Sequence, residues 1–190
     1  MELVTAFLIA IFVSQCALLG ASLAFCVKYT TLALSYGYNA PYVPTHPEYF
    51  EKIAGALEIK VDDIVYDLGC GDGRLILFCA RREPHAQFIG IERNRLLVAY
   101  ARTRKLMTGN PSNVSFRCKD FFDVNFSEAT CIYSYLLPQT VNALFSRRNL
   151  TGVRLISRAF PLYNRTPTEV IRLSQKDGSH GEHLLYAYKL

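Results

Sequence analysis

The sequence predicts an α/β domain with a doubly wound, mostly parallel sheet, preceded by a separate apolar segment. Two observations predict the domain: strand and helix patterns alternate after Asp62, and a glycine-rich turn directly follows the first strand. A third observation predicts the separate segment, because no charged residue occurs from Leu3 to Val27. At 190 residues the chain has room for one such domain and an appendage.

The apolar segment LVTAFLIAIFVSQCALLGASLAFCV is 25 residues long. As a helix it would reach roughly 37 Å, enough to cross a hydrocarbon core of about 30 Å with some tilt. We therefore expect a transmembrane anchor over residues 1–30. A cleaved signal peptide is the alternative, but Glu2 takes the place of a basic n-region and the run exceeds the usual length of about 7–15 residues. A buried core helix is a third option, disfavoured because the run has no polar face.

The charges around the apolar segment predict its orientation. Lys28 follows it and the rest of the chain is rich in Arg and Lys, whereas the short tail before it holds no basic side chain. By the positive-inside rule, we expect a single-pass membrane protein with its globular part on the cytoplasmic or mitochondrial matrix side. The cysteines agree with a reducing compartment, because none forms a CxxC pair or a metal-ligand spacing. We therefore expect neither a bound metal nor a disulfide.

Basic residues gather in RNRLLVAYARTRK, Arg93 to Lys105, although the net charge of the chain is a moderate +5. One interpretation is a solvated helix face. The other is a face that lies against anionic lipid close to the anchor. The sequence leaves both interpretations open.

Residues 31–60 contain a proline- and aromatic-rich loop and then a helix, which we expect to cover the site of the domain. Three prolines in APYVPTHPEY, residues 40–49, forbid a continuous helix there. A helix is predicted from Pro47 to Leu57, where apolar residues recur at helical spacing. The ligand-binding domain then occupies residues 61–190.

From Asp62 onward the hydrophobic pattern predicts seven strands and three helices. The strands are expected at residues 64–68, 87–92, 114–118, 130–136, 153–160, 169–173 and 184–188. The helices are expected at residues 74–82, 95–107 and 138–147. No helix separates the last two strands, and QKDGSHGE between them is rich in turn residues, so we expect a C-terminal antiparallel hairpin.

Three glycines stand at alternate positions in VYDLGCGDGR, residues 65–74, directly after the first strand. In a doubly wound sheet, ligands bind at the carboxyl ends of the strands, where this turn presents backbone N–H groups and a helix N-terminus. Glycine permits positive φ and lets a ligand approach the backbone closely. Gly69, Gly71 and Gly73 therefore predict a ligand-contacting loop; a tight turn without a ligand is the alternative.

The acids around this loop favour a cationic cofactor over a nicotinamide dinucleotide. The dinucleotide fingerprint G-x-G-x-x-G has its third glycine one position later, and Asp72 would place a carboxylate where a pyrophosphate lies. A cofactor with an ammonium group and a sulfonium tolerates that acid and is attracted by Asp67. Glu92 ends the second strand about 20 residues beyond the loop, where an acid can bind both ribose hydroxyls. Taken singly, each of these acids also has a structural interpretation, as a helix cap or a first-turn charge.

DLGCGDGR, Asp67 to Arg74, resembles motif I of the class I S-adenosylmethionine-dependent methyltransferases. The resemblance implies a Rossmann-like seven-stranded fold and S-adenosyl-L-methionine as the cofactor. It also places an acid after the third strand near the adenine amino group, a position that Asp120 in CKDFFD holds here. The cofactor-binding residues expected on this basis are Asp67, Gly69, Cys70, Gly71, Asp72, Gly73, Glu92, Arg93, Asp120 and Phe121.

The order of motifs narrows this resemblance. An apolar anchor, APYVPTHPEYF, DLGCGDGR, IGIERN, RCKDFFD and a strand ending in LLP resemble the small membrane-anchored protein-lysine methyltransferases. That group includes the enzymes acting on the ATP synthase c-subunit and the adenine nucleotide translocase, and bacterial relatives. The resemblance implies a lysine acceptor on a membrane-associated protein. A basic or amphipathic presequence is missing, so a bacterial inner membrane and a mitochondrial membrane both stay open.

The acceptor is less constrained than the cofactor. CIYSYLLP lacks the Asn/Asp-Pro-Pro-aromatic motif of many nucleic-acid amino-methyltransferases, so we expect a protein and no nucleic acid as the substrate. Thr45 and Tyr135 are the candidates for orienting the amine, and Tyr133 is expected to pack in the core. Two alternatives stay open: a methyltransferase for a lipid or lipophilic small molecule, and a non-catalytic scaffold that retains the cofactor fold.

Overall fold

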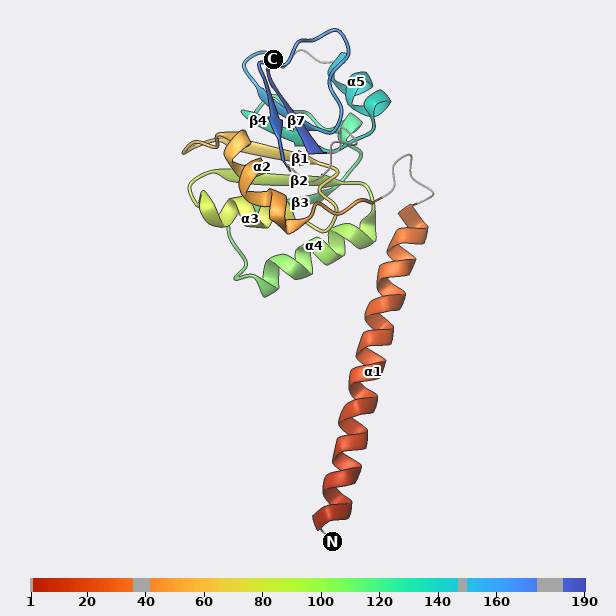
Figure 1. Ribbon diagram of the computed structural model, residues 1–190. Coiled ribbons are helices and arrows are strands. Elements are labelled where there is room, and N and C mark those ends of the chain that lie inside the picture. Colours follow the sequence, from red (N-terminus) through yellow and green to blue (C-terminus); the bar gives the residue numbers. More distant parts are fainter. Residues whose placement is uncertain (1, 36–41, 147–149, 174–182) are drawn as a thin grey trace. The chain divides into compact units, whose positions relative to one another are not determined.

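The computed structural model describes residues 2–35, 42–146, 150–173 and 183–190 (Figure 1). The chain divides into two units, Met1–Tyr42 and Val43–Leu190. All seven strands lie in the second unit. The expected boundaries at residues 30 and 60 stay predictions.

The first unit contains one long helix, α1 (Glu2–Ser35), which continues past the expected end of the anchor. Its stretch Val4–Cys26 is long and apolar enough to cross a membrane, and none of it is buried within the protein. A signal sequence near the N-terminus would meet the same criteria of length and apolarity. The predicted helix is therefore confirmed, while its role as an anchor stays a prediction.

The second unit is built on one seven-stranded sheet with the order β3-β2-β1-β4-β5-β7-β6. Strands β1 to β5 pair in parallel, and β7 pairs antiparallel with both β5 and β6. The predicted antiparallel pair at the C-terminus is confirmed, but β7 inserts between β5 and β6. The predicted turn QKDGSHGE, residues 175–182, lies outside the described residues. The strands are β1 (Ile64–Leu68), β2 (Gln87–Glu92), β3 (Val114–Cys118), β4 (Cys131–Ser134), β5 (Arg154–Arg158), β6 (Glu169–Arg172) and β7 (Leu184–Lys189).

Helices cover both faces of the sheet, as a doubly wound fold requires. The helices are α2 (Phe50–Leu57), which follows the 3₁₀ turn η1 (Pro47–Tyr49), then α3 (Arg74–Arg82), α4 (Arg95–Met107) and α5 (Pro138–Ser146). Helices α2, α3 and α4 contribute to one hydrophobic core and α5 to the other (Figure 1). Alternate strand residues enter the two cores, so Tyr133 lies in the first and Ile132 in the second. The packing expected for Tyr133 is confirmed.

The carboxyl ends of the parallel strands bring distant parts of the chain to one edge of the sheet. Asp67, near the end of β1, lies opposite Gly90 in β2 and Tyr133 in β4. Glu92 ends β2 and Arg158 ends β5. We call this edge the carboxyl edge; the predicted site residues have to meet there.

Candidate functional site

The loop after β1 owes its shape to three glycines with positive φ, at +75° for Gly69, +55° for Gly71 and +72° for Gly73. Gly73 also has no room for a side chain, and Gly69 has little. A Cβ on Gly73 would lie 2.5 Å from Phe116 Cζ, and one on Gly69 would lie 3.1 Å from Leu136 Cδ2. Glycine is therefore required by both conformation and packing, and it leaves the backbone N–H groups of the loop close to the start of α3.

Gly90 in β2 lies directly against the glycine loop, and it was not predicted as a site residue. A Cβ there would lie 2.7 Å from Cys70 Sγ and 2.7 Å from Phe116 Cδ1. The signal was available, because a glycine inside an apolar strand such as FIGIE marks a close approach of another group. Burial raises the pKa of the Cys70 thiol well above its usual value, so Cys70 stays a neutral thiol beneath the loop.

Glu92 joins the glycine loop to the end of β2. Its Oε2 accepts a hydrogen bond from Gly71 N at 3.1 Å, and its Oε1 accepts one from Asn94 N at 2.8 Å. Burial raises the pKa of this carboxyl, and the backbone N–H groups of Asn94 and Gly71 oppose that rise. Each carboxylate oxygen keeps further acceptor capacity, which suits a pair of hydroxyl donors.

Asp67 is the most perturbed acid of the site. Its side chain is buried at the carboxyl edge, and its exposed fraction is 6%. Burial raises its pKa to about 7, and the negative charges of Glu92 and Asp72 add to the rise. A cation placed beside Asp67 would reverse this and favour the carboxylate.

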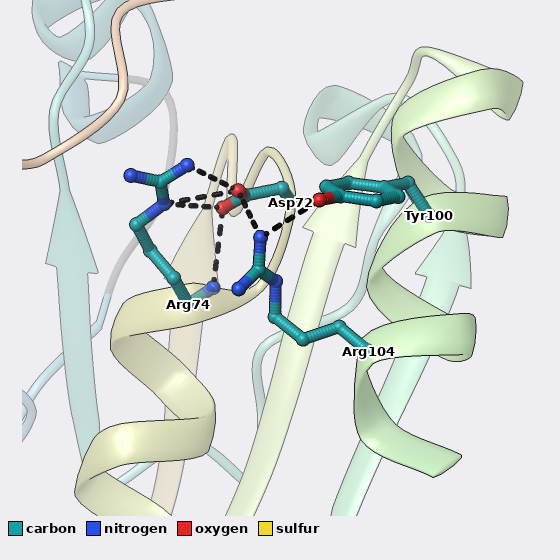
Figure 2. A network of polar contacts seen from close by, with 4 residues as sticks. All are labelled: Asp72, Arg74, Tyr100 and Arg104. Atoms are coloured by element: carbon teal, nitrogen blue, oxygen red, sulfur yellow. Dashed lines mark hydrogen bonds and ion pairs between the residues drawn. The ribbon is translucent and has the colours of Figure 1, made fainter. Parts of the chain in front are cut away.

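Asp72, the other acid of the loop, is engaged by two arginines (Figure 2). Its Oδ2 lies 2.6 Å from Arg74 Nη2 and 3.0 Å from Arg104 Nη2, and Arg104 also donates to the Tyr100 hydroxyl at 3.2 Å. Burial pushes the pKa of Asp72 upward, but the hydrogen bonds and charge of Arg74, then the charge of Arg104, hold it below its usual value. The electrostatic case against a pyrophosphate therefore depends on Asp67 and Glu92 rather than on Asp72. The role of Asp72 as a cofactor ligand stays a prediction.

Asp120 and Arg93 follow the neighbouring strands β3 and β2. Asp120 caps the short 3₁₀ turn η2 (Phe121–Asp123) by accepting from Phe122 N at 3.0 Å. Arg93 Nη1 lies 3.5 Å from Asp120 Oδ2. The half-buried Phe121 packs on Phe122, with ring centroids 5.0 Å apart. Asp120, expected near the adenine, thus has two other expected cofactor-binding residues as neighbours at the carboxyl edge.

The two candidates for the acceptor side, Thr45 and Tyr135, are connected by Arg158. Arg158 Nη1 donates to Thr45 Oγ1 at 2.9 Å, and its guanidinium carbon lies 4.4 Å from the centroid of the Tyr135 ring. The same carbon lies 5.2 Å from the centroid of the Tyr49 ring, and only 5% of Arg158 is exposed. Sequence reasoning missed Arg158, although an arginine at the end of the buried strand RLISR is an unusual residue.

Tyr133 lies against this group from β4. Burial raises the pKa of its phenol far above the usual value, so the phenol stays protonated at neutral pH. The charge of Arg158 and the polar side chains of Thr45 and Arg158, which interact with the Tyr133 hydroxyl, oppose that rise. Tyr133 therefore belongs to the same buried polar group as Thr45 and Arg158.

Comparisons with known proteins agree with this geometry. Residues 67–169, more than half of the chain, match the family model described as the ANTKMT methyltransferase domain. The chain belongs to this methyltransferase family. It is 35% identical over 161 residues to a protein-lysine N-methyltransferase of Saccharolobus islandicus, with 82% of this chain and 96% of that protein covered.

Other relatives of the methyltransferase are named for different substrates. The Homo sapiens lysine N-methyltransferase of the ATP synthase c-subunit is 29% identical over 133 residues, which cover 68% of this chain and 56% of that protein. This chain thus spans a little over half of that relative. The crystal structure of an RNA methyltransferase from Salinibacter ruber, with bound S-adenosyl-L-homocysteine, gives a TM-score of 0.67 at 30% identity over 77% of this chain and 92% of that one.

The methyltransferase uses S-adenosyl-L-methionine as its cofactor, as these comparisons establish. The residues at the carboxyl edge fit that molecule. Asp67 is buried and Glu92 half-buried, and both acids have raised pKa values, which a bound cation would lower; the glycines let a ligand approach the backbone. Within the described residues, no three His, Cys, Asp or Glu side chains gather as metal ligands would. The expectation that no metal is needed stays a prediction.

Proposed function

We propose that this methyltransferase transfers a methyl group to the ε-amino group of a lysine on a membrane-associated protein. The assignment of lysine as the acceptor is supported by the similarity to the Saccharolobus islandicus protein-lysine methyltransferase, which extends over 96% of that protein. The observation that favours a membrane-associated acceptor is the apolar stretch Val4–Cys26, which we propose as the anchor. The catalytic domain would then lie on the cytoplasmic or matrix side.

The cofactor would be held by the residues of the glycine loop and its neighbours. Glu92 would accept hydrogen bonds from the ribose hydroxyls with its free acceptor positions. The carboxylate of Asp67 would attract the positively charged groups of the cofactor. Asp120, with Arg93 and Phe121, lies on the side that we assign to adenine. When bound, S-adenosyl-L-methionine supplies a methyl group on a positively charged sulfur.

The acceptor amine would enter beside Thr45, Tyr135 and Arg158. Because Thr45 Oγ1 already accepts from Arg158, its remaining lone pair is held in one direction. A neutral amine can donate its N–H groups to Thr45 Oγ1 and to the Tyr135 hydroxyl, which aims the nitrogen lone pair at the methyl group. Fixing this approach is the main contribution that an enzyme makes to an in-line displacement.

The same cluster also affects the protonation state of the acceptor amine. A lysine amine has an unperturbed pKa of about 10.4, so only about 1 in 2,500 is neutral at pH 7. The guanidinium of Arg158 is a fixed positive charge in a buried setting, and it lowers the pKa of an ammonium group brought next to it. The amine then loses its proton to solvent on entry, and the protein needs no dedicated general base.

An RNA acceptor is the second candidate, favoured by the similarity to the Salinibacter ruber RNA methyltransferase. A lipid or lipophilic acceptor is favoured by the N-terminal apolar helix alone. The family membership and the intact acids Asp67 and Glu92 count against a non-catalytic scaffold. The fourth strand leads into SYLLP, residues 134–138, rather than into the motif of many nucleic-acid amino-methyltransferases, which favours a protein over RNA.

A labelling experiment tests the proposal. The full-length chain is incubated in native membranes and cytosol with methyl-labelled S-adenosyl-L-methionine, and protein, RNA and lipid are separated afterwards. We expect label in protein, recovered as methyllysine after acid hydrolysis. Glu92→Gln should remove the label by weakening cofactor binding, whereas Glu169→Gln, the same change at an exposed position in β6, should not. Label confined to RNA or to lipid would refute the lysine acceptor.

A further inference from the structure

Helix α4 has an apolar face toward the core and a second one toward solvent. Leu97, Val98 and Ala101 are buried against the sheet. At 3.6 residues per turn, the opposite face is formed by Leu96, Ala99, Thr103, Leu106 and Met107. Three of these are large apolar side chains with exposed fractions of 46% for Leu96, 65% for Leu106 and 81% for Met107. A helix on the surface of a soluble domain normally directs charged residues outward at these positions.

Basic side chains border this exposed stripe. Arg95 and Arg102 lie along one side of it, and Tyr100, 48% exposed, lies along the other beside Arg104, whose charge is paired with Asp72. No Asp or Glu occurs between Arg93 and Lys119. Among the residues that the structure describes, no carboxylate lies within ion-pair distance of Arg95 or Arg102. Arg102 donates to the backbone carbonyl of Phe116 at 2.9 Å, which leaves its positive charge uncompensated.

We propose that this α4 surface, residues 95, 96, 99, 102, 103, 106 and 107, docks on an anionic membrane. An apolar stripe bordered by arginines is the pattern of a helix that lies in the membrane interface, where its apolar side chains enter the acyl boundary and its cations meet lipid headgroups. RNA would be contacted by charges and stacked aromatic rings, and exposed Leu and Met side chains serve neither purpose. Tyr100, the exposed ring beside the stripe, already packs against the guanidinium of Arg104, 5.0 Å from its centroid. The combination therefore favours lipid.

The proposal rests in part on the membrane attachment proposed above. Eight chain steps separate Ser35, the last residue of α1, from Val43. An anchored α1 would tether the domain to the bilayer through this short stretch of chain. The α4 surface would then fix how the domain is turned on the bilayer. Glu92 lies at the carboxyl edge, and α4 begins three residues later, directly after its N-cap residue Asn94. Docking of α4 on the membrane would therefore set the orientation of the carboxyl edge.

The absence of tryptophan from the chain provides a clean probe. Leu106→Trp places a single tryptophan in the exposed stripe, and Val170→Trp places one at a comparably exposed position, 51% exposed, in β6 at the far edge of the sheet. Each full-length variant is reconstituted in nanodiscs of zwitterionic lipid alone or with 30% anionic lipid, both containing brominated acyl chains. Resistance to alkaline carbonate extraction reports separately on insertion of α1.

We expect the emission of Leu106→Trp to shift to the blue and to be quenched in the anionic nanodiscs, and that of Val170→Trp to stay unchanged. Adding Arg95→Gln and Arg102→Gln to Leu106→Trp should lower the ratio of docked to free domain by about 25-fold, since each basic residue near an anionic surface contributes about fivefold. An unquenched Leu106→Trp in a chain that resists carbonate would refute the α4 surface and leave the anchor intact.

Three further outcomes are decisive. A chain extracted by carbonate would refute the anchor, and the α4 surface would then be judged by the quenching of Leu106→Trp on added anionic vesicles. Equal quenching in both lipid compositions would refute the anionic surface. An emission shift caused by RNA in the absence of lipid would overturn the proposal in favour of nucleic acid.

Discussion

The raised pKa of Asp67 predicts that cofactor binding strengthens as the pH rises from 6 to 8. With a pKa of about 7, the carboxyl is about 9% ionised at pH 6 and about 91% ionised at pH 8. If the positively charged cofactor binds only the carboxylate, its Kd at pH 6 is about tenfold larger than at pH 8. The pKa of Glu92 is also raised, so protonation of Glu92 at low pH weakens binding in the same direction.

Isothermal titration calorimetry checks this prediction with S-adenosyl-L-methionine at the two pH values. Repeating the titration in buffers of different ionisation enthalpy should reveal release of up to about 0.9 proton per molecule bound at pH 6. Asp67→Asn should bind more weakly and lose most of the pH dependence. A Kd that does not change with pH, or an equal pH dependence in Asp67→Asn, would refute the assignment of the cation to Asp67.

Without cofactor, ionisation of Asp67 should make the folded protein less stable as the pH rises, the opposite of its effect on cofactor binding. The pKa of Asp67 in the folded state lies above its value of about 3.9 in an unfolded chain, so ionisation opposes folding increasingly from pH 4 upward and fully above pH 7. The penalty is at most about 4 kcal/mol above pH 7. Asp67→Asn should therefore raise the Tm at pH 8 more than at pH 5, and a lower Tm at pH 8 would contradict the reasoning.

Three further predictions concern the loop and the acceptor side. Gly152→Ala should cost about 1 kcal/mol in urea unfolding because of its φ of +84°, whereas Gly73→Ala should cost roughly 2–4 kcal/mol because its Cβ also meets the Phe116 ring; equal costs would contradict the packing argument. Asp72→Asn should lose about 2 kcal/mol at pH 7 by leaving two guanidinium groups without their carboxylate, and the difference from the wild type should vanish as the pH falls through the lowered pKa. Arg158→Met should move the pH profile of kcat/KM upward by about one unit and Arg158→Lys should restore it, and a profile unchanged in Arg158→Met would exclude a role on the amine.

Much of the fold could be predicted because its signals are local. The ranges expected for β1, β2, β3, α3 and α4 agree with the structure, since each is a short periodic run ended by turn residues. The register of parallel strands then brings Asp67 and Glu92 to one edge without any further information. The insertion of β7 between β5 and β6 was not predicted, because strand order depends on which edge of the sheet is still unpaired when the last two strands join it.

The sequence by itself predicted the cofactor and proposed residues for its site, since three glycines and two acids at set distances along the chain are the pattern of the family's motifs. Only the tertiary structure decided which polar and charged side chains are paired with one another and which are left to bind a ligand. It brings Arg104 from α4 to Asp72, 32 residues away, and Arg158 to Thr45, 113 residues away. These partners lie on different elements, and no periodicity or spacing connects them, so their contacts arise only when the helices and the loop before α2 pack on the sheet.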